Sequence, residues 1–333
     1  MSLTDLNGQT CLVTGASGFL GSFVTENLVE HGARVRCIVR RSSRREFIPT
    51  LGTEFVPGDI TDVASLRSAL VGVDVVFHLA GLIKAAHLED YYRVNYLGTI
   101  NLLEACRAQG DRVQRLVLVS SLAAAGPSEP GHPVVETSPC RPVSPYGKSK
   151  LEAERALVAY RSHLPVTVVR PPTIYGPRDL ETLLLFRVAA LGIRPSLGSG
   201  SEVSVIHAAD LADGIILAAT HPAAVGQTYF MASDETPSID DLVRQISATL
   251  RRRSLAVPIP AWAVRGAARV AETVRDVGGP TVVFDRWKAE EILHGYWACS
   301  NARAKSELGF APRVPLADGL AETARWYRKM GWL

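Results

Sequence analysis

Residues Thr10 to Gly21 read TCLVTGASGFLG and decide the fold. The first five residues form a short apolar, β-branched run, which is typical of a buried strand. Gly15, Gly18 and Gly21 follow at intervals of three residues, and a helical spacing of apolar residues begins directly after them. Between a strand and a helix, this spacing predicts the turn that holds a dinucleotide pyrophosphate against a helix N-terminus. The candidate cofactor contacts in this turn are Gly15, Ser17, Gly18, Phe19, Leu20 and Gly21.

Strands and helices alternate outward from this turn. Further apolar runs predict strands at 35–39, 54–56, 73–79, 116–119 and 165–169. Helical spacing predicts helices after Gly21 and at 64–70, 91–109, 146–160 and 211–220. Near-continuous apolar strands that alternate with helices are typical of a parallel sheet covered on both faces. We therefore predict an α/β fold, a Rossmann-type doubly wound parallel sheet, with ligands at the carboxyl ends of its strands.

The regular alternation stops after Pro171, where prolines and glycines become dense. We expect residues 1–175 to form the nucleotide-binding Rossmann domain and 203–225 to return to it. Residues 176–333 would then form mainly a smaller, interleaved C-terminal substrate lobe. The stretch Ala261 to Val274 is partly apolar, with interspersed arginines. A packed domain helix is the default interpretation, and a lid, a dimer contact or a peripheral membrane face stay open.

Composition bounds the class of protein. The 333 residues are 47% hydrophobic and 21% charged, the balance of an ordinary globular protein with a full core. The net charge of +3 is too small for a protein that wraps nucleic acid. No apolar run is long enough to span a membrane and no export signal is visible, so a cytoplasmic location is expected. The five cysteines are scattered without metal-ligand spacing, so no metal site is expected.

The end of the second strand bears on the choice of cofactor. NAD sites place a carboxylate there to accept hydrogen bonds from the ribose 2′-hydroxyl. Here Arg40 and Arg41 follow the strand instead, and a guanidinium matches a 2′-phosphate in shape and charge. We predict NADP(H) in preference to NAD(H), with a solvated basic loop as the alternative. After the third strand, Asp59 and Ile60 suit a contact with the adenine ring, although Asp59 could instead cap the next helix.

The catalytic candidates follow the fifth strand. Tyr146 and Lys150 lie four residues apart in a predicted helix, so they project from one face. A free tyrosine has a pKa of about 10, and a neighbouring ammonium together with a positive nicotinamide ring would pull it toward neutrality. Ser120 and Ser121, at the end of the fifth strand, offer a second hydrogen-bond donor to a substrate oxygen. These are the groups that proton exchange at an alcohol carbon requires.

The chain resembles the extended short-chain dehydrogenase/reductases, the group of 3β-hydroxysteroid dehydrogenase-like, dihydroflavonol reductase-like and nucleotide-sugar epimerase/dehydratase enzymes. The matching motifs run in family order. They are TGASGFLG (14–21), GDITD (58–62), HLAG (78–81), VNYLGT (94–99), VSSLAAAG (119–126), YGKSK (146–150), RPPTIYGP (170–177) and VIHAADLADG (205–214). The C-terminal NARAKSELGFAPRVPLADGLAETARWY (301–327) resembles the same group's closing segment, so the resemblance covers nearly the whole chain.

The resemblance implies roles for particular residues. Ser121, Tyr146 and Lys150 would form the active triad, with Ser121 rather than Ser120 because it lies five residues before Gly126. Asn95 would support the proton relay, with a structural, helix-kinking role as the alternative. The remaining implied cofactor contacts are Leu79, Ala80, Gly81, Tyr146, Lys150, Pro171 and Thr173. Arg40 falls where NADP-using reductases of this group often carry an arginine.

Three functions stay open. The first is an NADP(H)-dependent oxidoreductase that interconverts a secondary alcohol and a ketone on a fairly apolar small molecule. The second is a nucleotide-sugar epimerase with tightly bound NAD(P), in which Arg178, Arg187 and Arg194 could hold a diphosphate. The third is a Rossmann protein that binds nucleotide without turnover. No acid follows Ser121, which speaks against a sugar dehydratase. Analogy with the group also implies a possible homodimer.

Overall fold

A seven-stranded parallel sheet forms the centre of the computed structural model, which describes residues 5–196, 200–276 and 284–333. The strands run in the order β11-β6-β5-β4-β1-β2-β3. Their bounds are β1 (Thr10–Thr14), β2 (Arg34–Val39), β3 (Thr53–Pro57), β4 (Val75–His78), β5 (Arg115–Val119), β6 (Val166–Arg170) and β11 (Thr228–Phe230). The chain begins in the middle, builds outward to β3 and then returns through β4. The strand order therefore reverses between β1 and β4, the place where such sheets bind ligands.

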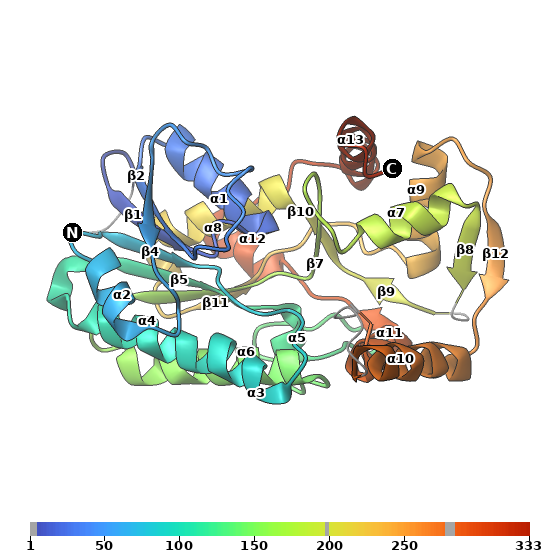
Figure 1. Ribbon diagram of the computed structural model, residues 1–333, viewed down its shortest axis with the longest axis horizontal. Helices are drawn as coiled ribbons and strands as arrows, with labels where there is room; N and C mark the ends of the chain where they lie inside the picture. The colour runs from blue at the N-terminus through green and yellow to red at the C-terminus, as the bar shows by residue number, and fades with distance from the viewer. Residues whose placement is uncertain (1–4, 197–199, 277–283) are drawn as a thin grey trace.

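Helices cover both faces of this sheet, as Figure 1 shows. On one face, α1 (Phe19–Glu30), α8 (Ala208–Thr220) and α12 (Ala302–Leu308) share a buried cluster with strand residues such as Val13 and Phe77. On the other face, α2 (Val63–Ala69) and α4 (Gly98–Arg107) bury apolar side chains against Leu12 and Val76. Neighbouring residues of one strand thus enter different cores. This arrangement confirms the predicted doubly wound sheet.

The predicted strands are present, and the largest departure is in the helix expected at 91–109. The structure divides this segment into α3 (Leu88–Tyr91), a π-helical turn (Tyr92–Leu97) and α4. Such a turn holds one more residue than an α-helical turn and often lies at a functional site. Asn95 lies inside the turn.

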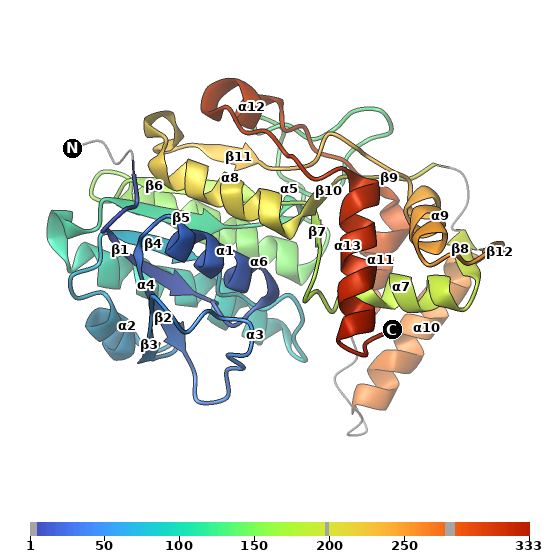
Figure 2. The same ribbon diagram turned by 90° about the horizontal axis from the view of Figure 1, so that it is seen from above.

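A second group of elements packs beside the carboxyl edge of the sheet. It contains three short parallel pairs and five helices. The pairs are β7 (Thr173–Tyr175) with β10 (Val205–His207), β8 (Ile193–Ser196) with β12 (Leu255–Pro258), and β9 (Glu202–Val203) with β13 (Tyr296–Trp297). The helices are α7 (Leu183–Ala190), α9 (Ile239–Thr249), α10 (Ala261–Asp276), α11 (Arg286–His294) and α13 (Leu316–Lys329). Figure 2 shows these elements gathered at one end of the molecule.

The chain passes more than once between the two groups of elements. After β10, α8 packs against α1, and β11 then adds an edge strand to the large sheet beside β6. The predicted boundary at residue 175 and the return at 203–225 stay predictions. Within the described ranges, no helix has the length and apolarity needed to cross a bilayer.

Candidate active site

The glycine turn after β1 packs tightly on the end of β4. Gly15 has a φ of +76°, and a Cβ placed on it would lie 2.7 Å from the backbone nitrogen of Ala80 and 2.8 Å from the carbonyl carbon of Leu79. A Cβ on Gly21 would lie 2.1 Å from the carbonyl oxygen of Gly15. Both positions therefore require glycine on steric grounds. The structure also brings the predicted cofactor contacts Leu79 and Ala80 beside the turn.

The N-terminus of α1 is open to an anion. Gly18 is the N-cap residue, and no side chain in the described part of the chain caps the helix or places an acid in its first turn. Ser17 and Gly18 are exposed, while Phe19 and Leu20 are half-buried. Unpaired N–H groups and the positive end of the helix dipole favour a phosphate at this place. The residues of the turn therefore fit a dinucleotide pyrophosphate.

Arg40 and Asp59 lie near one another beyond the ends of β2 and β3. Burial raises the pKa of the Asp59 carboxyl. Hydrogen bonds from Thr61 and the charges of Arg40 and Arg93 together lower this pKa by more than burial raises it, so it falls below the usual value. The backbone N–H of Arg40 donates to Ser43 Oγ at 2.9 Å, which closes the turn after β2. Arg40 and Arg41 are both exposed, so their guanidinium groups are accessible to a ligand.

The alternative role for Asp59 as a helix cap is wrong. Asp59 Oδ1 accepts from the backbone N–H and the hydroxyl of Thr61, at 2.8 and 2.7 Å. Asp62 caps α2 instead, through its contact with the N–H of Ala64 at 3.0 Å. The neighbouring Ile60 is buried.

Tyr146 is held beside Ser121 by close packing of two helices. Ser121 is the N-cap residue of α5 (Leu122–Ala125), and its Oγ accepts from the N–H of Ala123 at 3.1 Å. Helix α6 (Pro145–Ala156) begins with Tyr146 in its first turn. A Cβ on Gly147 would lie 2.2 Å from the carbonyl oxygen of Ala123, so α6 approaches α5 at a distance that only glycine allows. Ser121 lies close enough to Tyr146 to lower the pKa of its hydroxyl group.

Lys150 extends from the same helix to the end of β5. Its buried Nζ donates to the carbonyl oxygen of Val119 at 2.9 Å. A Cβ on Gly81 would lie 3.2 Å from this Nζ and 3.0 Å from Asn95 Oδ1. Lys150, Gly81 and Asn95 are therefore neighbours.

The amide of Asn95 is occupied by structural partners. Its Oδ1 accepts from the N–H of Leu82 at 2.7 Å, and its Nδ2 donates to the Leu82 carbonyl at 3.0 Å and to Ser149 Oγ at 2.9 Å. These bonds tie the π-helical turn to α6 and to the loop after β4. They favour the structural alternative for Asn95, and its part in a proton relay stays a prediction.

The electrostatics of Tyr146 differ from the expectation. Burial raises the pKa of Tyr146 to about 12, although the hydrogen bond from Ser121 lowers it, and Glu291 is among the groups that raise it. Burial also lowers the pKa of the Lys150 amino group to about 8, which the negative charge of Glu154 partly offsets. Lys150 donates to a backbone carbonyl and is not among the groups that act most on the Tyr146 pKa, and burial is the largest of these effects.

A buried network beneath the site was not foreseen from the sequence. Ser120 donates to Glu154, and Glu154 forms a buried ion pair with Arg170 at 2.6 Å. Arg170 belongs to the RPPTIYGP motif, and an arginine that follows an apolar strand was the available signal. Since Ser120 is engaged there, Ser121 is the serine that faces Tyr146.

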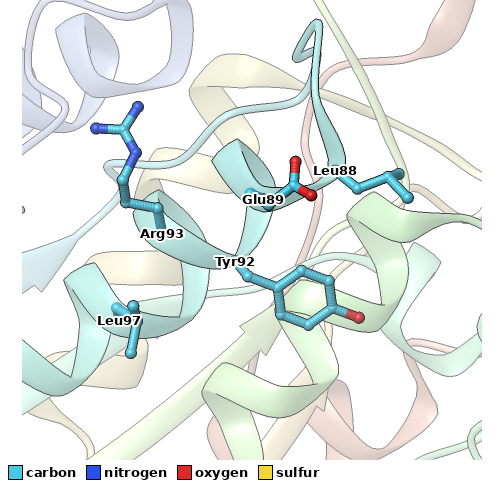
Figure 3. A pocket seen from close by; sticks show the side chains of 5 residues that line it. All are labelled: Leu88, Glu89, Tyr92, Arg93 and Leu97. Atoms are coloured by element: carbon cyan, nitrogen blue, oxygen red, sulfur yellow. The ribbon is translucent and has the colours of Figure 1, made fainter.

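The remaining implied contacts, Pro171 and Thr173, follow β6 in the chain. The carbonyl of Pro171 accepts from the N–H of Leu122 at 2.8 Å, which places the end of β6 against α5. Thr173 begins β7 and is exposed. A hollow on the outer side of α3 and the π-helical turn is a different place, lined by Leu88, Glu89, Tyr92, Arg93 and Leu97. Figure 3 shows their side chains projecting from these two segments, and the predicted catalytic residues are not among them.

Comparison with known proteins agrees with this geometry. Residues 11–232 match the model of the NAD dependent epimerase/dehydratase family. The chain belongs to this family. It is therefore an extended short-chain dehydrogenase/reductase, as the motifs predicted, and an NAD(P)-dependent oxidoreductase.

Individual relatives include both reductases and epimerases. The chain is 33% identical to the ceramide reductase of Caulobacter vibrioides over 99% of this chain and 98% of that protein. It is 27% identical to the UDP-glucose 4-epimerase of Vibrio cholerae over 95% of each. The crystal structure of gox2253 is 30% identical, with a TM-score of 0.82 over 98% of this chain and all of that one. The family and the fold of the chain are thus shown.

Proposed function

We propose that the protein is an NADP(H)-dependent oxidoreductase that interconverts a secondary alcohol and a ketone on a fairly apolar small molecule. The observation that carries this proposal is the close approach of α6, which bears Tyr146 and Lys150, to α5, which begins after Ser121, at the sheet edge that also holds the open glycine turn. Groups that share a substrate oxygen must converge at one place, and this close approach supports the proposal.

Each residue has a distinct part in this reaction. A bound nicotinamide supplies the two-electron chemistry. The Tyr146 hydroxyl exchanges a proton with the substrate oxygen, and Ser121 donates a hydrogen bond to the same oxygen. Lys150, fixed through the Val119 carbonyl, places a positive charge near the cofactor side of the site and holds ribose hydroxyls. The glycine turn binds the pyrophosphate.

The preference for NADP(H) rests on charge at the end of β2. Arg40 and Arg41 are exposed there, in the place where an NAD site carries a carboxylate. Arg40 also lies near Asp59, beyond the neighbouring strand. A 2′-phosphate would gain charge-assisted hydrogen bonds from a guanidinium in this position.

The three arginines that an epimerase could use for a diphosphate are engaged within the chain. Arg178 forms a bidentate pair with Glu26, at 2.8 and 3.0 Å, and stacks over Phe23. The other two are paired as well: Arg194 with Asp240, and Arg187 with the Trp332 carbonyl. A diphosphate would have to displace these partners, so the arrangement favours the apolar substrate. The similarity to a ceramide reductase supports the same choice.

Substitution of the phenol tests the catalytic role. We expect Tyr146→Phe to lower kcat at least ~100-fold, the usual contribution of a general acid or base, while NADPH binding is retained. Tyr92→Phe, on the outer side of the π-helical turn, serves as the matched control and should keep normal rates. A near-normal rate in Tyr146→Phe would refute the assignment.

Substitution of an arginine tests the cofactor. Arg40→Ala should weaken NADPH binding about tenfold or more, the loss of one charge-assisted pair, and leave NADH binding unchanged. Arg44→Ala, which is exposed in the same loop, is the control. Equal losses for both dinucleotides would show that Arg40 does not read the 2′-phosphate.

A substrate panel separates the two candidate reactions. NADPH oxidation is followed with long-chain β-keto compounds, ketosteroids and simple aldehydes. Nucleotide sugars are assayed for product without net cofactor change. Turnover of a nucleotide sugar without NADPH consumption, and none of any ketone, would replace the proposal with the epimerase.

A further inference from the structure

Helix α10 carries two apolar faces, and the residues that the structure describes cover only one of them. Val264 and Ala268 are buried and share an apolar cluster with Ala289 of α11. On another side of the helix, Trp262 is 76% exposed and Val270 is 65% exposed, and Val274 is exposed as well. These residues recur at intervals of four or eight positions, so they form one stripe along the helix. The packed helix predicted from the sequence therefore also presents an apolar stripe to its surroundings.

The apolar surface continues on the strand that leads into α10. All four residues of β12 are exposed, and Leu255 is 78% exposed. The N–H of Leu255 donates to the carbonyl of Gly192 at 3.0 Å, which places it beside the exposed Leu191. Figures 1 and 2 both show β12 and α10 at the end of the molecule farthest from the N-terminus. We call this region, residues 191–193, 251–258 and the outer stripe of α10, the distal face.

Positive charge borders the distal face. Arg251, Arg252 and Arg253 are all exposed, and one residue separates them from β12. Arg269 is exposed on α10, next to the apolar stripe. Arg265 is neutralised by Glu290, through a hydrogen bond of 2.7 Å. Arginines that flank exposed Trp, Leu and Val side chains match the composition of a surface that lies in a lipid headgroup region.

We propose that the distal face docks on the surface of a bilayer that contains anionic lipids. Trp262 and the neighbouring aliphatic side chains enter the boundary between headgroups and acyl chains, and the four exposed arginines contact lipid phosphates. No insertion of a spanning helix is involved. The exposed arginines that border the distal face favour a lipid surface over a second copy of this chain. Two copies joined through this face would bring their arginine clusters together, and like charges repel.

Helix α11 lies between α10 and the reaction centre. Helix α11, which packs on α10, contributes Glu291, whose charge acts on Tyr146. Docking of the distal face would bring the enzyme to a substrate that dissolves in a membrane. This consequence rests on the proposed function, whereas docking itself does not require that the reaction be the proposed one.

Vesicle binding tests the proposal with the whole protein. Co-sedimentation is measured with vesicles of phosphatidylcholine alone and of phosphatidylcholine mixed with phosphatidylglycerol. We expect binding to the mixed vesicles, weaker binding to the neutral ones, and a loss of binding as salt is raised. The double variant Trp262→Ser, Val270→Ser should bind at least ~10-fold more weakly, which corresponds to about 1.4 kcal/mol of lost apolar transfer.

Matched controls keep the test specific. Leu51→Ser removes an apolar side chain that is 86% exposed but lies between β2 and β3, and it should leave vesicle binding unchanged. The double variant should keep its NADPH affinity, because it lies outside the cofactor site. Absence of binding to anionic vesicles, or equal binding by the double variant, overturns the proposal.

Two further outcomes are decisive. If the unchanged protein is a dimer that the double variant converts to a monomer, and neither binds vesicles, the distal face is an interface between copies and the proposal is wrong. If vesicle binding is present but no ketone is reduced, docking stands and the proposed function fails. The two failures are therefore distinguishable.

Discussion

The buried ion pair beneath the active site provides a quantitative test of the structure. Glu154 and Arg170 lie 2.6 Å apart and are both buried, and Glu154 also accepts a hydrogen bond from Ser120. Glu154→Gln keeps the shape of the side chain and removes its charge. The Arg170 guanidinium would then be buried without a counter-charge.

The expected cost follows from the burial of this pair. Removal of one partner from a buried pair typically costs about 3–5 kcal/mol, because the remaining charge is not compensated. The Gln oxygen can still accept one hydrogen bond, so we expect a loss of about 3 kcal/mol. Glu152→Gln, on the same helix, breaks an exposed pair with Arg155 and should cost only ~0.3–0.5 kcal/mol.

Urea unfolding of the variants measures this difference from their midpoints and slopes. The double variant Glu154→Gln, Arg170→Met removes both charges and should recover part of the lost stability. A loss in Glu154→Gln as small as that in Glu152→Gln would show that the pair is not buried as the structure has it.

The same substitution has a second readout at Lys150. The negative charge of Glu154 raises the pKa of the Lys150 amino group, against the larger effect of burial. Without that charge the pKa falls below its value of about 8, so a limb of the pH–rate profile that reports Lys150 moves to lower pH. A stability loss with no movement of that limb would leave Glu154 a purely structural residue.

Three further substitutions test other parts of the chain. Gly15→Ala should lower the free energy of unfolding by about 2–4 kcal/mol and abolish NADPH binding. The reason is that the left-handed backbone and the close contact with Ala80 both oppose a Cβ at this position. Normal nucleotide affinity in this variant would contradict the prediction. His78 is buried with a pKa lowered to about 3, so below pH 6.5 the unfolded chain binds a proton that the folded chain excludes. Stability should therefore fall on acidification by up to about 1.4 kcal/mol per pH unit, and His78→Asn should reduce that slope in denaturation measured from pH 6.5 downward. Asp210→Ala leaves two backbone N–H groups near the C-terminus without their acceptor, which should cost about 2–3 kcal/mol in urea unfolding; a loss within experimental error would contradict the contacts.

Much of the sheet could be predicted from local sequence because its strands are buried on both sides. A run such as Thr10–Thr14 has no polar alternation, and short apolar runs between helical patterns define parallel strands. The edge strand Thr228–Phe230 was missed, because its three residues carry no such signal by themselves. Its place depends on pairing with β6, a contact between segments far apart in the chain.

The π-helical turn at 92–97 shows a different limit. Apolar spacing predicts a helix there, and the segment is helical, but one turn holds an extra residue. This turn is bonded to segments outside the helix. Asn95 satisfies both backbone groups of Leu82 and also bonds to Ser149, and these partners come from two other segments. A pattern within one helix contains no information about such partners.

The ionisation of Tyr146 depends most on long-range structure. A spacing of four residues correctly places Tyr146 and Lys150 on one helix, but it does not determine where the lysine amino group finds its acceptor. That group donates to Val119, and burial acts on both side chains in opposite directions, raising the pKa of the phenol and lowering that of the amine. The phenol is thereby neutral near pH 7, whereas the amine, with a pKa of about 8, still carries its positive charge there. A neutral phenol is the form that can give a proton to a ketone oxygen. Burial raises the pKa of Tyr146, against the lowering expected from the sequence, and the resulting neutral phenol therefore suits reduction of a ketone.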